Sequence, residues 1–365
     1  MSEKVWQKAA QAVVKASSDP LLQANETIVE LLKTLLNENE AKLISNFRKP
    51  ILTLDKLKEK SGMDDKSLKQ ILNSIMKKGV IMDIPHKKTG NMGYQLLAPL
   101  PYLWEYSIIK KGSMEKKKKI AQIHEKMMKE AVEQTQRNYE GIVPILKAQF
   151  PPLTRTIPIE KDIGIAIEET LPLSKASKLL EKHDIISISE CPCKLDKNLI
   201  EDPCKMATER CRCFHFGNTG RFFIEHGFGE PVTIDRAKQI LMAAEKDGLV
   251  HKVFHYGFDL EDEEEALCNC CKCCCMVFQS YYRGIWPFHT VTSFIARLDD
   301  NKCKGCGTCV EKCPIEAISL TNGKSFIDET RCIGCGVCVY HCPEKTRHLE
   351  KTELRNVYIP PPKRD

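Results

Sequence analysis

The sequence lacks any long apolar segment. No run among its 365 residues approaches the about 18 consecutive apolar residues that a membrane-spanning helix needs. Residues 1–20 carry charges throughout and lack the continuous apolar stretch of a secretory signal. We therefore expect a cytoplasmic protein without a membrane span.

Nucleotide-binding motifs are also missing. The sequence has no Walker loop for phosphate, and no G-x-G-x-x-G motif follows a predicted strand. Neither a nucleotide site nor a flavin site is therefore indicated.

Cysteine is absent from residues 1–150, yet the whole chain holds 19 cysteines. A reducing cytoplasm keeps thiols from pairing, so this density does not predict a disulfide framework. Metal or cluster ligation is the better interpretation.

Two runs near the C-terminus follow the pattern C-x2-C-x2-C-x3-C-P. They are "CKGCGTCVEKCP" at 303–314 and "CIGCGVCVYHCP" at 332–343. This repeat is typical of bacterial two-cluster ferredoxins, in which the fourth cysteine of each run ligates the other cluster. One [4Fe–4S] cluster is thus predicted on Cys303, Cys306, Cys309 and Cys342, and the second on Cys332, Cys335, Cys338 and Cys313.

A zinc ribbon is the alternative for these cysteines, but it uses two C-x2-C pairs rather than two runs of four. The two ferredoxin halves continue into segments of different polarity. The first continues into the apolar "PIEAISL", whereas the second continues into the polar "PEKTRHLEK". We expect the polar segment to face solvent, with packing on this chain or on a partner as the alternatives.

Eleven further cysteines form two groups in the middle of the chain. The first group is Cys191, Cys193, Cys204, Cys211 and Cys213, and the second is Cys268, Cys270, Cys271, Cys273, Cys274 and Cys275. Between them, residues 233–248 have the cap, apolar spacing and terminal glycine of a helix that could carry the chain back. We expect the groups to face each other and to hold at least one more iron–sulfur cluster. The second group is too large for one ligand set, so some of its thiols are expected to ligate another cluster, to lie around the ligands or to be structural.

The segments "ISECPCK", "CRCFHFG" and "CNCCKCCC", followed by the ferredoxin repeat, resemble a family of 4Fe–4S dicluster-domain proteins from anaerobes. The resemblance covers roughly residues 155–345. It implies a ligand group of Cys191, Cys193 and Cys204 with either Cys213 or Cys211, and it implies an iron–sulfur electron carrier. Lys194 stands where many relatives have arginine.

The first 150 residues are basic, with 26 Lys and Arg against 17 Asp and Glu. Apolar spacing predicts a helical stretch at 26–47, and capping residues predict a second helix from Thr53 to Gly62 and a third from Asp64 or Asp65 to Gly79. Two short strands are expected within 80–99. A long helix is expected at 113–139. Helices followed by a hairpin in this order predict a winged-helix-like domain.

Winged helices often bind DNA through the third helix and the hairpin loop. The residues available are Lys66, Ser67, Lys69, Gln70, Asn73, Lys77 and Lys78 on the helix, and His86, Lys87 and Lys88 in the loop. Lysines suit phosphates, but the helix lacks base-reading arginines. The sequence therefore permits DNA binding and favours protein docking.

Two further sets of residues lie around the middle cysteines. His215, His226, His251 and His255 are expected to be structural, with ligation of one iron as the alternative. The aromatic residues of 281–289 ("YYRGIWPFH") are expected to pack over a cluster and exclude water.

The predicted fold class is α+β. It comprises a winged-helix-like domain (1–110), a helical connector (111–154), a cysteine-rich iron–sulfur domain of mixed structure (155–290), a two-cluster ferredoxin-like βαβ repeat (291–350) and a tail (351–365). The function expected is electron transfer as a subunit or partner of an anaerobic oxidoreductase, with a redox partner protein. The alternatives are a redox-responsive transcription regulator and a reductase with a catalytic middle cluster.

Overall fold

The fold was analysed in a computed structural model. It describes residues 3–17, 21–85, 89–152, 154–159, 175–206, 212–255, 260, 262–299 and 302–364. The described chain divides into two compact units. The first is residues 1–131 with 195–202 and 222–228, and the second is the remainder. None of the described helices is long and apolar enough to cross a membrane.

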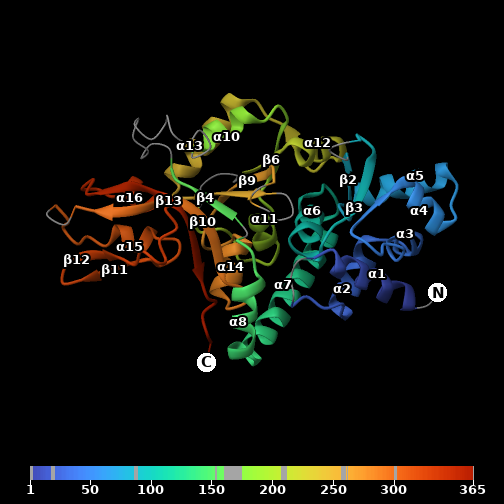
Figure 1. The fold of residues 1–365 in the computed structure, drawn as a ribbon, viewed down its shortest axis with the longest axis horizontal. Coiled ribbons are helices and arrows are strands. Elements are labelled where there is room, and N and C mark those ends of the chain that lie inside the picture. The colour runs from blue at the N-terminus through green and yellow to red at the C-terminus, as the bar shows by residue number, and fades with distance from the viewer. Residues whose placement is uncertain are drawn as a thin grey trace. The chain divides into compact units, whose positions relative to one another are not determined.

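The first unit is mainly helical, with a small sheet (Figure 1). Its elements are α1 (Glu3–Lys15), α2 (Glu26–Leu35), α3 (Glu38–Ile44), β1 (Ile51–Thr53), α4 (Leu54–Ser61), α5 (Asp65–Met76), β2 (Ile81–Pro85), β3 (Met92–Leu96), η1 (Pro99–Leu103) and α6 (Trp104–Ile109). The three strands pair in the order β1-β3-β2, all antiparallel. The predicted helices at 53–62 and 64–79 and the two strands within 80–99 are present, and β1 is a third strand that the sequence did not predict.

Local capping fixes where these helices begin. The side chain of Thr53 accepts a hydrogen bond from the amide of Lys56 at the start of α4, and Asp64 caps α5 in the same way. Such caps contribute about 1 kcal/mol each. The predicted helical stretch at 26–47 is two helices, because Asn37 forms a capping box with Glu40 and starts a new helix.

Glu40 is the main buried charge of this unit. Its side chain is 2% exposed and pairs with Lys78 at 2.6 Å. Burial by itself raises the pKa of Glu40, but hydrogen bonds from Lys78, Ser74 and the Asn37 amide lower it overall. Lys78, which follows α5, thus forms a structural ion pair, whereas Lys66 and Lys69 of α5 and Lys77 at its end are exposed.

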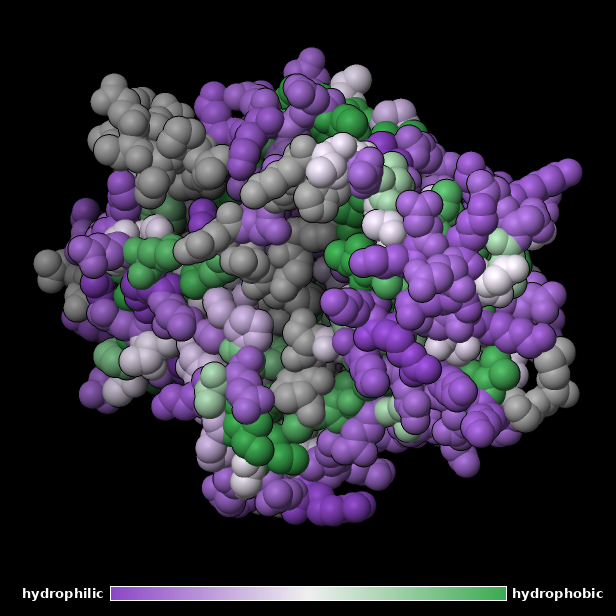
Figure 2. All heavy atoms as spheres, turned by 45° about the vertical axis from the view of Figure 1, so that its right-hand side comes forward, coloured by the Kyte–Doolittle hydropathy of each residue, from purple (hydrophilic) through white to green (hydrophobic). Residues whose placement is uncertain are grey.

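The surface that carries α1–α5 is rich in polar side chains. Figure 2 turns that side of Figure 1 forward, and the residues displayed there are mainly hydrophilic. The expected loop residues His86, Lys87 and Lys88 lie outside the described residues.

The remaining described helices are α7 (Met114–Arg137), which begins in the first unit, α8 (Tyr139–Gln149), α10 (Ala176–Lys182), α11 (Pro192–Leu199), α12 (Gly217–His226), α13 (Ile234–Lys246), α14 (Met276–Tyr282), α15 (Thr308–Lys312) and α16 (Val337–Tyr340). The predicted long helix at 113–139 is confirmed as α7. So is the helix capped by Thr233, which is α13.

One eight-stranded sheet organises the second unit, in the order β13-β10-β4-β8-β9-β6-β5-β7. Its strands are β4 (Thr154–Ile157), β5 (Ile186–Glu190), β6 (Arg212–Phe216), β7 (Glu230–Pro231), β8 (Val250–His255), β9 (Glu264–Cys270), β10 (Phe288–Leu298) and β13 (Arg347–Ile359). The cysteine-rich segment and the ferredoxin segment therefore share a single sheet.

The ferredoxin segment contains two strand–helix–strand passages, β10–α15–β11 and β12–α16–β13. The hairpin of β11 (Ile318–Thr321) and β12 (Lys324–Ile327) joins them (Figure 1). β13 runs across the boundary expected at residue 350 and pairs with β10 along most of its length. The polar segment after Cys342 does not simply face solvent, since Arg347 and Leu349 are buried there.

Candidate metal centres

The first ferredoxin ligand set surrounds one small hollow. Cys303, Cys306, Cys309 and Cys342 line this hollow together. The loop before α15 turns sharply at Gly307, whose φ of +82° is the left-handed conformation that glycine adopts without strain. Three cysteines from one turn and a fourth from the other run therefore face the same space, as the spacing predicted.

The second set is more deeply placed. Cys313, Cys332, Cys335 and Cys338 are all buried and lie close enough to interact electrostatically. The amide of Ala317 donates to the sulfur of Cys313 at 3.2 Å. A side chain at Gly334 would collide with the carbonyl oxygen of Phe294, so the backbone comes close only because this residue is glycine.

Arg347 is a feature of the first set that the sequence did not indicate. It is 5% exposed, and its guanidinium donates to the sulfur of Cys309 at 3.4 Å. It also donates to the hydroxyl of Ser325. A buried cation hydrogen-bonded to a thiolate stabilises negative charge on that ligand, which is one of the protein's means of setting cluster potential.

The side chains of six middle cysteines form a ring in which each thiol interacts with the next, here called the six-thiol group. Its members are Cys268, Cys213, Cys191, Cys193, Cys275 and Cys270, in the order of their contacts. Cys275 and Cys270 lie 3.3 Å apart. Pairing of β6 with β9 places Cys213 opposite Cys268, and Cys268 and Cys270 project from the same face of β9.

Hydrogen bonds within the six-thiol group shift the pKa values of its thiols in opposite directions. The thiols of Cys193 and Cys213 donate to Cys191 and hold its pKa well below the usual value. The same contacts raise the pKa of both donors. The amide of Met276, at the start of α14, donates to the Cys193 sulfur at 3.3 Å. Thiolate character is thus favoured at part of the group, as metal ligation requires.

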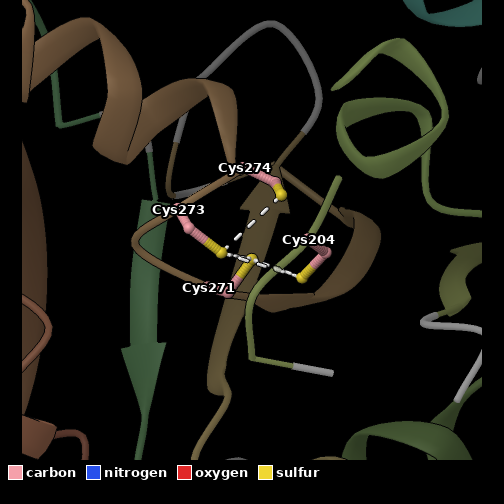
Figure 3. A group of neighbouring side chains, drawn as sticks. All are labelled: Cys204, Cys271, Cys273 and Cys274. Atoms are coloured by element: carbon pink, nitrogen blue, oxygen red, sulfur yellow. Dashed lines mark hydrogen bonds between the residues drawn. The ribbon is translucent and has the colours of Figure 1, made fainter. Parts of the chain in front are cut away.

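Four other cysteines form a second, more compact set, here called the four-thiol group. It consists of Cys204, Cys271, Cys273 and Cys274, whose sulfurs all lie within 4.8 Å of one another (Figure 3). The sulfur of Cys204 is 3.7 Å from those of both Cys271 and Cys273. Cys271 and Cys274 are buried, next to Ala244 of α13 and Leu249, which follows that helix.

The structure therefore divides the six cysteines of residues 268–275 between two sites. Cys268, Cys270 and Cys275 belong to the six-thiol group, and the other three cysteines belong to the four-thiol group. This corrects the grouping that the family resemblance implied, because Cys204 joins the second cysteine segment rather than Cys191 and Cys193. Cys211 lies outside the described residues.

A buried lysine lies near two of the thiol sets. Lys252 on β8 is fully buried, and its Nζ lies 4.2 Å from the ring centroid of Phe288 and has no hydrogen-bond partner among the described residues. Burial lowers the pKa of Lys252 to about 8, while attraction from Cys270, Cys275 and Cys335 acts in the opposite direction. When Cys270, Cys275 and Cys335 are ionised, as metal ligation requires, their negative charges would accompany this cation.

The histidines between the two cysteine segments have structural partners. His215 pairs with the hydroxyl of Ser189 at 2.9 Å, and His251 pairs with Asn269 at 2.8 Å. Burial lowers the pKa of His215 to about 3, so its ring stays neutral. The compact group of potential metal ligands found among the described residues contains no histidine.

Aromatic residues of α14 and of the segment after it lie in the same core as the thiols. The ring centroids of Phe278 and Phe288 lie 4.9 Å apart with the rings tilted by 36°, and Tyr281 meets Phe288 edge to face. One apolar cluster contains these rings together with Cys270, Cys275 and ferredoxin cysteines. Tyr281 and Phe288 of the segment 281–289 therefore pack beside these cysteines, and their role in covering a cluster stays a prediction.

Comparison with known proteins identifies the C-terminal segment. Residues 295–343 match the model of the 4Fe-4S dicluster domain. The chain is also similar to Ferredoxin-2 of Desulfomicrobium norvegicum, with 54% identity over 28 residues. That match covers 8% of this chain and 48% of the relative, so the chain spans about half the length of the ferredoxin it matches. No solved structure matches.

The geometry and these matches define a class of protein. The chain carries a ferredoxin-like 4Fe–4S domain at its C-terminus, together with a cysteine group that could bind a metal centre in its middle region. These features support iron–sulfur clusters and indicate iron–sulfur electron transfer.

Proposed function

We propose that this chain is an electron-transfer protein that connects a middle iron–sulfur site to two ferredoxin clusters. The supporting observation is the shared core. Cys270 and Cys275 of the six-thiol group and Cys309, Cys313, Cys332, Cys335 and Cys338 of the ferredoxin segment lie in one apolar cluster. Such a core excludes water between the sites. In this proposal the middle site passes electrons to or from the ferredoxin clusters, a role that a ferredoxin without a middle site does not have.

In this proposal the ferredoxin clusters are held as the spacing predicts. Cys303, Cys306, Cys309 and Cys342 hold one [4Fe–4S] cluster, and Cys332, Cys335, Cys338 and Cys313 hold the other. The six-thiol group holds the third. The group has close pairs, such as Cys270 and Cys275 with sulfurs 3.3 Å apart, but among the described residues no three of its sulfurs lie within 4.8 Å of one another, so the six thiols together extend beyond the ligand shell of one ion. A multi-iron centre needs such a spread.

The exposure of the cysteine ligands suggests which site exchanges electrons at the surface and which lies in the interior. Cys306 is exposed, and Cys303 and Cys342 are half-buried, whereas Cys191, Cys213, Cys270 and Cys275 are buried. We therefore propose that a redox partner protein exchanges electrons at the hollow beside Cys306, and that the six-thiol group is the inner station. A role beside an anaerobic oxidoreductase belongs to the same proposal.

Iron analysis and electron paramagnetic resonance of anaerobically purified protein test this assignment. Three [4Fe–4S] clusters give about twelve iron per chain, and two give about eight. The double variant Cys193→Ala/Cys275→Ala should lose about four iron and keep both ferredoxin signals. The matched control Cys306→Ala should instead perturb one ferredoxin cluster. About eight iron in the unmodified chain would refute the third cluster.

For the N-terminal unit we propose a winged-helix-like domain that docks onto protein. The order α2–α3–β1–α4–α5–β2–β3 and the exposed lysines of α5 support this proposal. Lysines without a base-reading arginine should give weak, unspecific and salt-sensitive binding to duplex DNA. Fluorescence anisotropy with duplex DNA tests this. Tight binding to one defined sequence at physiological salt, changing with cluster oxidation, would favour a transcription regulator instead.

A further inference from the structure

The spacing of the sulfurs in the four-thiol group differs from that in the other cysteine sites. Three pairs lie 3.7 Å apart and the fourth measured pair, Cys271 and Cys273, lies 3.5 Å apart. Four sulfurs bound to one zinc ion at about 2.3 Å are separated by about 3.8 Å along each edge of the tetrahedron. The observed distances therefore fit ligands that share one ion.

A cubane cluster would need a wider arrangement. Its four thiolates bind four separate irons at different corners of the cube, so their sulfurs lie farther apart than ligands of a single ion. The ferredoxin cysteines provide an internal comparison. Over the described residues, no three of these eight sulfurs approach one another as closely as those of the four-thiol group.

The elements that supply the four ligands also favour a closed structural site. Cys271, Cys273 and Cys274 come from the turn between β9 and α14, and Cys204 comes from the loop after α11. The amide of Lys205 donates to the sulfur of Cys273. Ala244 of α13 and Leu249 after that helix pack against the buried cysteines of the group. Four protein thiolates leave no open coordination position, as in structural zinc sites.

We propose that Cys204, Cys271, Cys273 and Cys274 bind a single zinc ion in tetrahedral geometry. The ion fixes the turn on which Cys270 and Cys275 stand, immediately before and after the zinc ligands. It thus ties the Cys204 loop to the segment that positions the six-thiol group. Zinc does not change oxidation state, so this site takes no part in electron transfer. The middle region then has one redox-active site and one structural ion.

Metal analysis of the full-length chain, purified anaerobically without added zinc and then with zinc, tests the proposal. One zinc per chain is expected, in addition to the iron. X-ray absorption at the zinc edge should show four sulfur neighbours at about 2.3 Å. This spectrum needs no variant, so it holds even if a substitution impairs folding. A spectrum with nitrogen or oxygen neighbours would overturn the ligand set.

Two cysteine variants separate this site from the clusters. Cys204→Ser should lose the zinc and keep the ferredoxin signals, whereas Cys306→Ser should keep the zinc and perturb one ferredoxin cluster. Loss of about four iron in Cys204→Ser from a chain without zinc would show a cubane instead. A single-iron signal that disappears in this variant would overturn the identity of the metal. The zinc content and the zinc spectrum do not depend on whether the chain transfers electrons. Electron transfer is tested separately, by the iron content and the reduction of the other sites.

Discussion

Lys252 offers the most direct test of how this chain sets its potentials. The substitution Lys252→Met removes a positive charge and keeps a side chain of similar length. Lys252 is fully buried, and the described residues give its Nζ no hydrogen-bond partner, so a methionine leaves no described donor or acceptor unpaired. The change therefore isolates the charge.

The expected effect depends on the position of this charge. Lys252 interacts with Cys270 and Cys275 of the six-thiol group and with Cys335 of the second ferredoxin set. A unit charge roughly 6–10 Å from a cluster contributes about 2–3 kcal/mol at an effective dielectric constant of about 20. A tenfold change in a one-electron equilibrium is about 59 mV, so the shift is on the order of 100 mV. The potential should fall, because the reduced cluster carries one more negative charge.

Redox titration of the anaerobic full-length protein, monitored by electron paramagnetic resonance, measures this shift. Two clusters should become harder to reduce, and the cluster on Cys303, Cys306, Cys309 and Cys342 should change little. The control is Lys324→Met on β12, an exposed lysine whose charge water and salt screen. Equal shifts in both variants, or an unchanged potential in Lys252→Met, would refute the reasoning.

Three further substitutions test other parts of the structure. Arg347→Gln should lower the potential of the first ferredoxin cluster by about 100 mV in the same titration, because a charge and a hydrogen bond to sulfur are lost; an unchanged potential would contradict this. Glu40→Ala should cost about 3 kcal/mol in urea unfolding, because Lys78 is left without its partner. Since the folded pKa of Glu40 is lowered, this cost should be full above the unfolded value of 4.5 and should disappear as pH falls through the folded value; a cost independent of pH would contradict it. Gly334→Ala should lose about four iron, whereas Gly323→Ala, with a similar φ but open space, should keep them; equal losses would point to backbone strain instead.

Local sequence was sufficient for the starts of several helices and for the order of ligands in the ferredoxin loops. Thr53, Asp64 and Thr233 cap helices where the sequence predicts them, because a cap depends on contacts within three residues. The first three ligands of each ferredoxin set stand within one short loop, so their spacing nearly determines their geometry. The break at Asn37 was missed, although the Asn and Glu of its capping box were visible in the sequence.

The division of the middle cysteines required the tertiary structure. The sequence showed two dense groups and predicted that they meet, but it could not assign partners across the residues between them. Pairing of β6 with β9 selects Cys213 and Cys268 as neighbours, and the turn after β9 directs Cys271, Cys273 and Cys274 toward Cys204. Adjacent cysteines thus separate into two sites, because neighbouring side chains leave the backbone in different directions and distant segments supply the remaining ligands.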